Sequence, residues 1–376
     1  MYGSDRVKGF SESVIREMTR KANRHNAINL SQGYPEYPTH QSVIKAAKEA
    51  IDSGYNQYSI TWGTNDLRKK VSEKLMDFNS LEYDPEYEIT LTCGASEAIM
   101  STILGLIERG DEVLIFQPFY ENYVPAVSMA SGKPIFTTID KNLDIDREDI
   151  KKKVGKDTKA IILNTPHNPT GKVFDREEIE FLRDLCIEKN MMLITDEIYE
   201  RIIFEGRHIS PASLEELKER TVTIGGFSKV YSVTGWRVGY AAAPKKLMKP
   251  IRKAHDYTTV CAPTPFQRGM IKALELPEDY YDEITRYYKK GRDIVYNGLK
   301  ETKMVPHKPD GAYYMMAEID DYDMGDEDFA DHLVKERGVA VVPGSSFFDD
   351  GGENMIRFCF SQTMDSLKEA MQSIKE

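Results

Sequence analysis

Short apolar runs alternate with helix-like stretches between about residue 40 and residue 245. The runs are short, continuous and rich in β-branched residues, which is typical of strands covered on both faces. The sequence therefore predicts an α/β fold, with a mostly parallel sheet between layers of helices. The five predicted strands lie at residues 88–92, 112–116, 159–164, 191–196 and 221–224.

Helical periodicity fills segments between these strands. Residues 96–109 follow a helical period that stops at Gly110, a residue that commonly ends helices. Asp175, with Glu178 three positions later, predicts a capping box that opens a second helix.

The regular alternation of strand-like and helix-like segments ends after about residue 246. A long charged helix is expected at residues 280–300 and a last helix at 364–374, with mixed elements between them. We interpret this part as a smaller α+β domain, completed by the N-terminal segment. The expected division is an N-terminal segment 1–39 that joins the smaller domain, a large domain 40–285 and a small C-terminal domain 286–376.

Composition narrows the class of protein. The 376 residues carry a net charge of −11, from 50 Lys and Arg against 61 Asp and Glu, which argues against a nucleic-acid surface. No apolar run approaches the roughly 20 residues that cross a bilayer. The first residues lack the apolar region of a signal peptide, so a cytoplasmic protein is expected. Four scattered cysteines, without a CxxC or HExxH pattern, predict no metal site.

The strongest chemical signal is Lys229. It follows an apolar run and is surrounded in sequence by Gly, Ser and aromatic residues, and Arg237 follows in Thr234-Gly235-Trp236-Arg237. This setting is typical of a pocket lysine that forms a Schiff base, beside an arginine that holds an anion. The leading chemistry that needs this pair uses pyridoxal phosphate.

Two small-residue sequences follow predicted strands, where an open α/β sheet binds its ligands. Gly94-Ala95-Ser96 would suit a phosphate at a helix N-terminus, although many strand-to-helix turns are built from small residues without a ligand. Asn168 lies in an Asn-Pro-Thr-Gly loop. That loop is either a stiff connection or the source of an amide donor.

Asp196 ends another predicted strand, and Tyr199 follows it. A carboxylate at the end of an apolar strand is costly unless it is paired. It is either a helix cap or the group that keeps a pyridine nitrogen protonated, with Tyr199 donating to the ring oxygen. The order of these sequences, together with Lys229, favours a single site over isolated surface residues.

These motifs make the chain similar to the fold-type I aminotransferases that depend on pyridoxal phosphate, a class that includes aspartate, aromatic, kynurenine and methionine aminotransferases. The resemblance runs from Asn29 to Ser361, nearly the whole chain. It implies a large cofactor-binding domain with a seven-stranded, mostly parallel sheet and a smaller α+β domain. It also implies ping-pong transfer of an amino group between an L-amino acid and a 2-oxo acid such as 2-oxoglutarate.

The resemblance assigns the cofactor ring to five residues of this chain. Lys229 would hold pyridoxal phosphate as a Schiff base and move the proton of the reaction, and Asp196 would pair with the ring nitrogen. Asn168 and Tyr199 would contact the ring oxygen. Tyr120, in Pro-Phe-Tyr-Glu-Asn-Tyr, would stack on the ring face.

The resemblance assigns the binding of the phosphate and of the substrate to other residues of this chain. The phosphate would be held by Gly94, Ala95, Ser96, Ser228 and Arg237. Many relatives carry a serine three positions before the lysine, where this chain has Gly226, so one hydroxyl contact is missing or replaced.

Arg357 would clamp the substrate α-carboxylate in a bidentate fork, helped by Gly33 and Asn168. Tyr58 would reach the phosphate of a neighbouring subunit's cofactor. That role implies a homodimer with shared sites.

The substrate stays open at this stage. Some aspartate aminotransferases carry a lysine at the position of Ser96, and this chain does not. Residues 256–265, with Tyr34 and Tyr37, look more like the kynurenine and methionine enzymes, which favours an aromatic or neutral amino donor. Aspartate remains possible, because a residue of the partner subunit could supply the missing charge.

Two other classes compete with the aminotransferase. A carbon–sulfur β-lyase that depends on pyridoxal phosphate would use the same lysine, aspartate and arginine. A regulator built on this fold usually has an N-terminal DNA-binding domain, for which the segment before Asn29 is too short. A nicotinamide dehydrogenase is disfavoured because no GxGxxG follows a strand.

Overall fold

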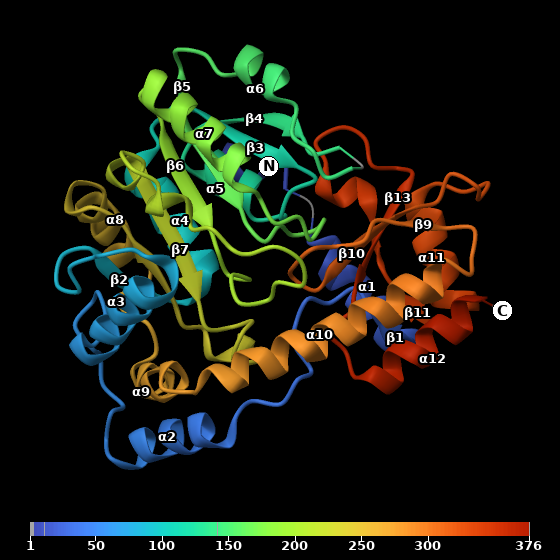
Figure 1. Ribbon diagram of the computed structural model, residues 1–376, viewed down its shortest axis with the longest axis horizontal. Helices are drawn as coiled ribbons and strands as arrows, with labels where there is room; N and C mark the ends of the chain where they lie inside the picture. Colours follow the sequence, from blue (N-terminus) through green and yellow to red (C-terminus); the bar gives the residue numbers. More distant parts are fainter. Residues whose placement is uncertain (1–3, 11, 141, 376) are drawn as a thin grey trace.

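The computed structural model describes residues 4–10, 12–140 and 142–375. Figure 1 shows a central sheet between helices, with a smaller group of strands and helices beside it. The central sheet has seven strands in the order β2-β8-β7-β6-β5-β3-β4. These strands are β2 (Ile89–Thr92), β3 (Glu112–Gln117), β4 (Lys133–Thr138), β5 (Thr158–Asn164), β6 (Met192–Asp196), β7 (Thr221–Gly226) and β8 (Gly239–Ala242).

The sheet is mostly parallel, as the sequence predicts. Strands β4, β3, β5, β6 and β7 pair in parallel, whereas β8 is antiparallel to both of its neighbours, β7 and β2. The carboxyl ends of β5, β6 and β7 therefore point to the same edge of the sheet.

Both faces of the sheet are buried. Along β3, Val113 and Ile115 pack into one apolar cluster, while Leu114 and Phe116 pack into another on the opposite face. Each such side chain contributes roughly 1.5–3 kcal/mol when it is removed from water. The first cluster includes residues of α4 (Gly94–Leu106), α5 (Tyr123–Met129) and α8 (Lys245–Thr258), and the second includes residues of α6 (Arg147–Lys153) and α7 (Arg176–Glu188).

The smaller group of elements contains two short sheets. One has the order β12-β13-β10-β9, and in the other β1 (Ile28–Asn29) pairs in parallel with β11 (Val339–Ala340). This second pairing joins the N-terminal part of the chain to its C-terminal part. The remaining strands are β9 (Val305–Pro306), β10 (Tyr314–Glu318), β12 (Val342–Pro343) and β13 (Met355–Cys359).

The remaining helices surround these sheets. Helices α2 and α3 both pack against α9, and α10 packs along α12. Figure 1 shows α10 as the long helix that runs from α9 to the smaller group. The bounds are α1 (Val14–His25), α2 (Gln41–Asp52), α3 (Asn65–Asn79), α9 (Thr264–Leu274), α10 (Glu278–Leu299), α11 (Asp326–Glu336) and α12 (Met364–Lys375).

The α/β fold and the five predicted strands are confirmed, and so is the capping box of Asp175 and Glu178, in which both reciprocal hydrogen bonds are present. Strands β4 and β8 were not predicted. The expected long helix corresponds to α10 and the expected last helix to α12. Among the described residues, no helix is both long and apolar enough to cross a membrane.

Candidate active site

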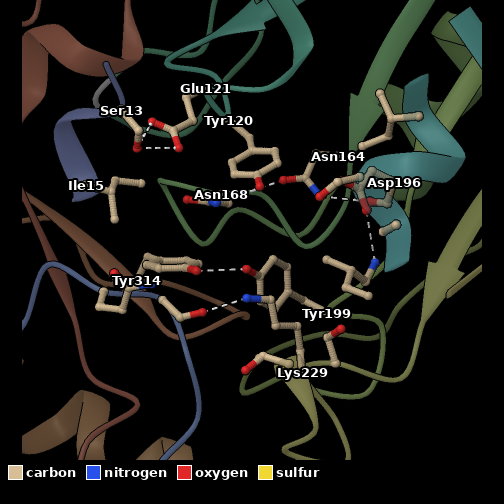
Figure 2. A pocket seen from close by; sticks show the side chains of 18 of the residues that line it. Ser13, Ile15, Tyr120, Glu121, Asn164, Asn168, Asp196, Tyr199, Lys229 and Tyr314 are labelled. Atoms are coloured by element: carbon tan, nitrogen blue, oxygen red, sulfur yellow. Dashed lines mark hydrogen bonds between the residues drawn. The ribbon is translucent and has the colours of Figure 1, made fainter. Parts of the chain in front are cut away.

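A cavity lies beyond the carboxyl ends of the central strands, between the sheet and the smaller group of elements. Figure 2 shows side chains from both parts pointing into it. The predicted site residues that line it are Gly33, Ala95, Ser96, Tyr120, Asn168, Asp196, Tyr199, Ser228, Lys229, Arg237 and Arg357. The structure thus gathers into one space residues that the sequence places from position 33 to position 357.

Two predicted residues lie outside the lining. Gly94 shapes the turn behind Ala95 and Ser96 without facing the cavity. Tyr58 is 81% exposed and lies away from the cavity. Its predicted role concerns a second subunit, so it stays a prediction.

Lys229 follows β7 and reaches into the cavity. Its Nζ donates a 2.6 Å hydrogen bond to the Gly33 carbonyl oxygen and lies 5.9 Å from the ring centre of Tyr199. Burial lowers the pKa of Lys229 to about 8, and the positive charges of Arg357 and Arg237 act in the same direction. A substantial fraction of the amine is therefore neutral near pH 8, which a proton acceptor requires.

Asp196 is the last residue of β6 and is buried. Its Oδ2 accepts a 2.8 Å hydrogen bond from the Tyr123 hydroxyl, and its Oδ1 accepts a 3.3 Å bond from the Ile198 amide. Burial raises the pKa of Asp196 to about 6, although the hydrogen bond from Tyr123 lowers it. No helix begins at Asp196, so it is not the helix cap that the sequence allowed.

Tyr123 was missed from the sequence. It begins α5, and nothing in its local pattern separates it from the other tyrosines. Its buried hydroxyl bonds a carboxylate from another element, so the signal is tertiary. The hydroxyl of Tyr199 is likewise paired, 2.8 Å from the hydroxyl of Tyr314, another lining residue that was not predicted.

Arg357, on β13, is fully buried between the rings of Tyr314 and Phe347, with its guanidinium carbon 4.5 and 4.7 Å from the ring centres. Its Nη1 donates to Asn168 Oδ1 at 3.1 Å, and its Nη2 donates to the Ser31 carbonyl oxygen at 2.7 Å. Its Nε has no hydrogen-bond partner among the described residues. A buried, rigid guanidinium with an unused donor is suited to a carboxylate.

The first residue of α4, Gly94, lies unusually close to Arg237. Gly94 has a φ of +78°, and a Cβ there would lie 2.3 Å from Nη2 of Arg237. The guanidinium donates to the Cys93 carbonyl oxygen at 3.3 Å, and Ser96 lies in the first turn of α4. A helix N-terminus beside an arginine is a ready site for an anion such as phosphate.

The mouth of the cavity is formed by α1 and the segment after β3. The Ser13 hydroxyl lies 2.8 and 2.9 Å from the two carboxylate oxygens of Glu121, and Ile15 and Arg16 also line this region (Figure 2). The Arg16 side chain forms no ion pair or hydrogen bond with the described part of the chain. Glu12, which precedes α1, is engaged by both terminal nitrogens of Arg20. Among the described residues, Arg16 is thus a cation with no fixed partner, and its place in the cavity was not predicted from its sequence surroundings.

Residues 25–374 match the family model for aminotransferase class I and II. The chain belongs to this family, it has the fold of the fold-type I enzymes that use pyridoxal phosphate, and it is an aminotransferase. It is 39% identical, over 99% of each chain, to a probable aspartate aminotransferase of Methanocaldococcus jannaschii. It is 34% identical to aromatic-amino-acid aminotransferase 2 of Thermococcus litoralis, over 99% of this chain and 97% of the relative.

The similarity extends to solved structures. The N-succinyldiaminopimelate aminotransferase of Mycobacterium tuberculosis superposes with a TM-score of 0.96 at 32% identity, covering 99% of each chain. A methionine aminotransferase of Escherichia coli superposes with a TM-score of 0.95 at 30% identity, covering all of this chain and 99% of the other. These relatives are all aminotransferases, and nothing in the comparisons favours the β-lyase.

Proposed function

We propose that this chain binds pyridoxal phosphate in the cavity and transfers an amino group from an L-amino acid to a 2-oxo acid, in two half-reactions at one site. The single observation that carries the proposal is the amine of Lys229, whose pKa is lowered to about 8, in the same cavity as Asp196 and Arg357. When bound, the cofactor supplies an electron sink for the charge that develops at the substrate Cα.

The lining residues fit this cofactor. The anionic phosphate would lie at the Gly94-Ala95-Ser96 turn, against Arg237 and Ser228, where only a glycine lets the guanidinium approach. Gly94, Ala95, Ser96, Ser228 and Arg237 would therefore hold the phosphate.

The ring would lie above the carboxylate of Asp196, which would pair with the ring nitrogen. A positive partner there would offset the burial that raises the pKa of Asp196. Tyr120 would cover one face of the ring. Asn168 and Tyr199 would donate to its phenolic oxygen.

The side chains of this protein then divide the work. Lys229 would take the proton from the substrate Cα as a neutral amine. It would then deliver this proton to the C4′ carbon of the cofactor. Arg357, aided by Gly33 and Asn168, would hold the α-carboxylate so that the Cα–H bond faces Lys229. The rings of Tyr314 and Phe347 would keep the guanidinium in place.

The amino donor is proposed as aromatic or neutral, or as aspartate. Tyr34 and Tyr37, which favoured the first class, do not line the cavity; Tyr37 packs instead on Tyr280 and Tyr287. Arg16 at the mouth supplies the cation that a second carboxylate needs. An acceptor such as 2-oxoglutarate carries such a group, so Arg16 supports this acceptor whichever donor is used.

The assembly is proposed as a cytoplasmic homodimer in which Tyr58 reaches the partner's phosphate. The high exposure of Tyr58 supports a contact outside its own chain. The division at residues 1–39, 40–285 and 286–376 is also proposed, supported by the pairing of β1 with β11.

The test is the Lys229→Ala variant. The purified protein reconstituted with pyridoxal phosphate should be yellow, and the colour should fade when a substrate amino acid is added. Lys229→Ala should lose both the colour change and turnover, while Lys45→Ala, an exposed lysine on α2, should keep them. Turnover by Lys229→Ala at the wild-type rate would overturn the proposal.

A further inference from the structure

His255 lies in the last turn of α8, where its side chain is 1% exposed. Its Nδ1 lies 3.1 Å from each carboxylate oxygen of Glu97, in the first turn of α4. Its Nε2 lies 2.8 Å from the carbonyl oxygen of Thr61, in the segment that leads to α3. The ring therefore bridges two segments that are far apart in the sequence.

Both ring nitrogens face groups that only accept hydrogen bonds. A carbonyl oxygen is always an acceptor, so Nε2 must carry a hydrogen towards Thr61. Glu97 is an acceptor as well, because its Oε2 also accepts a 3.0 Å bond from the Cys93 amide and its Oε1 accepts the Ser101 hydroxyl. Nδ1 must then carry a hydrogen too. The geometry thus favours a doubly protonated ring for His255, buried beside the carboxyl group of Glu97.

The electrostatics agree with this geometry. Burial acts to lower the pKa of His255, but the hydrogen bond and charge of Glu97 outweigh it, and the pKa is raised above its usual value. The Thr61 carbonyl and the neighbouring Asp256 on α8 act in the same direction.

Few other charges face the ring. Of the elements packed against α8, α4 brings Glu97, and β2 (Ile89–Thr92) has no ionisable side chain. The segment between α2 and α3 carries two ionisable side chains, Tyr55 and Tyr58. One turn earlier on α8, Arg252 is bonded to Thr90 and to backbone carbonyls.

Both partners of His255 lead to the proposed phosphate sites. Glu97 accepts the amide hydrogen of Cys93, the residue directly before Gly94-Ala95-Ser96, and so fixes the start of α4. Thr61 lies three residues after Tyr58, which would reach the partner's phosphate. A single ion thus connects the turn that would hold one phosphate to the segment that would touch the other.

We propose that His255 is a positioning residue for the cofactor phosphate. As a doubly donating imidazolium, it fixes the position of the Gly94-Ala95-Ser96 turn relative to the segment that contains Tyr58. The proposal rests on the proposed function, since the phosphate sites are assigned there. No role in proton transfer is involved, because His255 does not line the cavity.

The pH dependence has a defined sign. Because the pKa of His255 is higher in the folded protein than in the unfolded chain, its stabilising contribution is complete below about 6.5 and is lost as the pH rises through the folded-state pKa. The affinity of the protein for phosphate should fall over the same pH range.

The first measurement needs no cofactor. In the apoprotein with ¹⁵N-labelled histidine, NMR should find hydrogens on both nitrogens of the His255 ring at neutral pH. A ring with a single hydrogen would overturn the proposal, whatever the outcome for transamination. Conversely, a failure of the Lys229 test would leave this measurement unaffected, so the two failures can be told apart.

The second measurement is phosphate affinity. Inorganic phosphate should bind the apoprotein of His255→Gln roughly tenfold more weakly than wild type, the effect of about one charge-assisted hydrogen bond. His307→Gln is the matched control, because His307 pairs with Glu318 at 3.0 Å in the smaller group of elements. Equal phosphate affinity in wild type and a folded His255→Gln variant would overturn the proposal.

If His255→Gln does not fold, the pH dependence of phosphate affinity tests the positioning role of His255 instead. Phosphate affinity would be measured in the Lys229→Met background, so that this amine does not titrate in the same range. Affinity should fall with the same midpoint as the loss of the ring hydrogen. An affinity that stays level through that midpoint would refute the positioning role.

Discussion

The phenolic hydroxyl of Tyr123 donates a 2.8 Å hydrogen bond to Oδ2 of Asp196, joining the start of α5 to the end of β6. Both groups are buried. The bond holds the carboxylate in one orientation and lowers its pKa against the effect of burial. Tyr123 therefore takes part in setting the charge of the residue that is proposed to face the ring nitrogen.

Replacing Tyr123 by Phe removes this donor without opening a cavity. The pKa of Asp196 should rise above its value of about 6, so the carboxylate gains a proton at higher pH. Turnover should fall on the order of 10- to 100-fold near neutral pH, and the acid limb of the pH–rate profile should move to higher pH. Tyr281→Phe, which removes a buried hydroxyl pair with Tyr231 elsewhere, is the control. An unmoved acid limb would contradict the assignment.

Lys229 costs stability in the apoprotein. Its pKa is about 8 in the folded chain and higher in the unfolded chain, so its charged form is disfavoured by folding. The cost is fully present below about pH 8, and it declines as the pH rises towards the unfolded value near 10.4. Lys229→Met should therefore stabilise the apoprotein at pH 7, by roughly 3 kcal/mol at most.

The measurement is thermal unfolding of the apoprotein from pH 7 to pH 10.5. The gain in Tm from Lys229→Met should shrink across this range, while Lys45→Met, at a side chain that is 77% exposed, should change little at any pH. A gain that is constant with pH would mean that charge burial is not its cause.

Gly94 and Gly110 make a matched pair. Both have positive φ, +78° and +91°, so alanine should strain the backbone at either position by about 1 kcal/mol. Only at position 94 would the new Cβ meet the Arg237 guanidinium, whereas position 110 is open. Gly94→Ala should bind pyridoxal phosphate at least roughly tenfold more weakly, and Gly110→Ala should bind it like wild type. Equal affinities, measured by calorimetric titration, would place the phosphate elsewhere.

Arg16 and Arg20 lie one turn apart on α1, and only Arg16 lines the cavity. Arg16→Gln should raise the KM for 2-oxoglutarate roughly tenfold, the worth of one partly exposed ion pair in a bound complex. It should leave the KM for a 2-oxo acid with a single carboxylate unchanged. Arg20→Gln removes a cation that is already paired with Glu12 and serves as the control. A similar loss for both oxo acids would rule out a contact with the second carboxylate.

The sheet was predictable where its strands are buried on both faces. The run at residues 160–163 is continuously apolar, and this pattern can be recognised without knowing which strands lie beside it. The two missed strands lack it. β4 is at the edge of the sheet and is half-buried, and β8 consists of Gly-Tyr-Ala-Ala, whose small residues are poor strand formers in isolation. Their pairing is fixed by the rest of the sheet.

The site was predictable where its residues stand in motifs at the ends of strands, as Asp196 and Lys229 do. The residues that orient these side chains or add charge at the mouth of the cavity were not predictable. Tyr123, Tyr314 and Arg16 have ordinary sequence surroundings and acquire their roles from side chains that only the fold brings near. Asp196 could be recognised from the sequence, but the hydroxyl that orients it could not.

The contact between Arg357 and the Ser31 carbonyl oxygen joins residues 326 positions apart in the chain. During synthesis on the ribosome, the strand that pairs with β1 and the arginine that reaches Ser31 emerge long after the segments that they contact. Ser31 and its neighbours must stay without these partners until then. The cavity therefore takes its final shape only after β13 has been made, and a chain that stops before Arg357 lacks the guanidinium that is proposed to hold the substrate carboxylate.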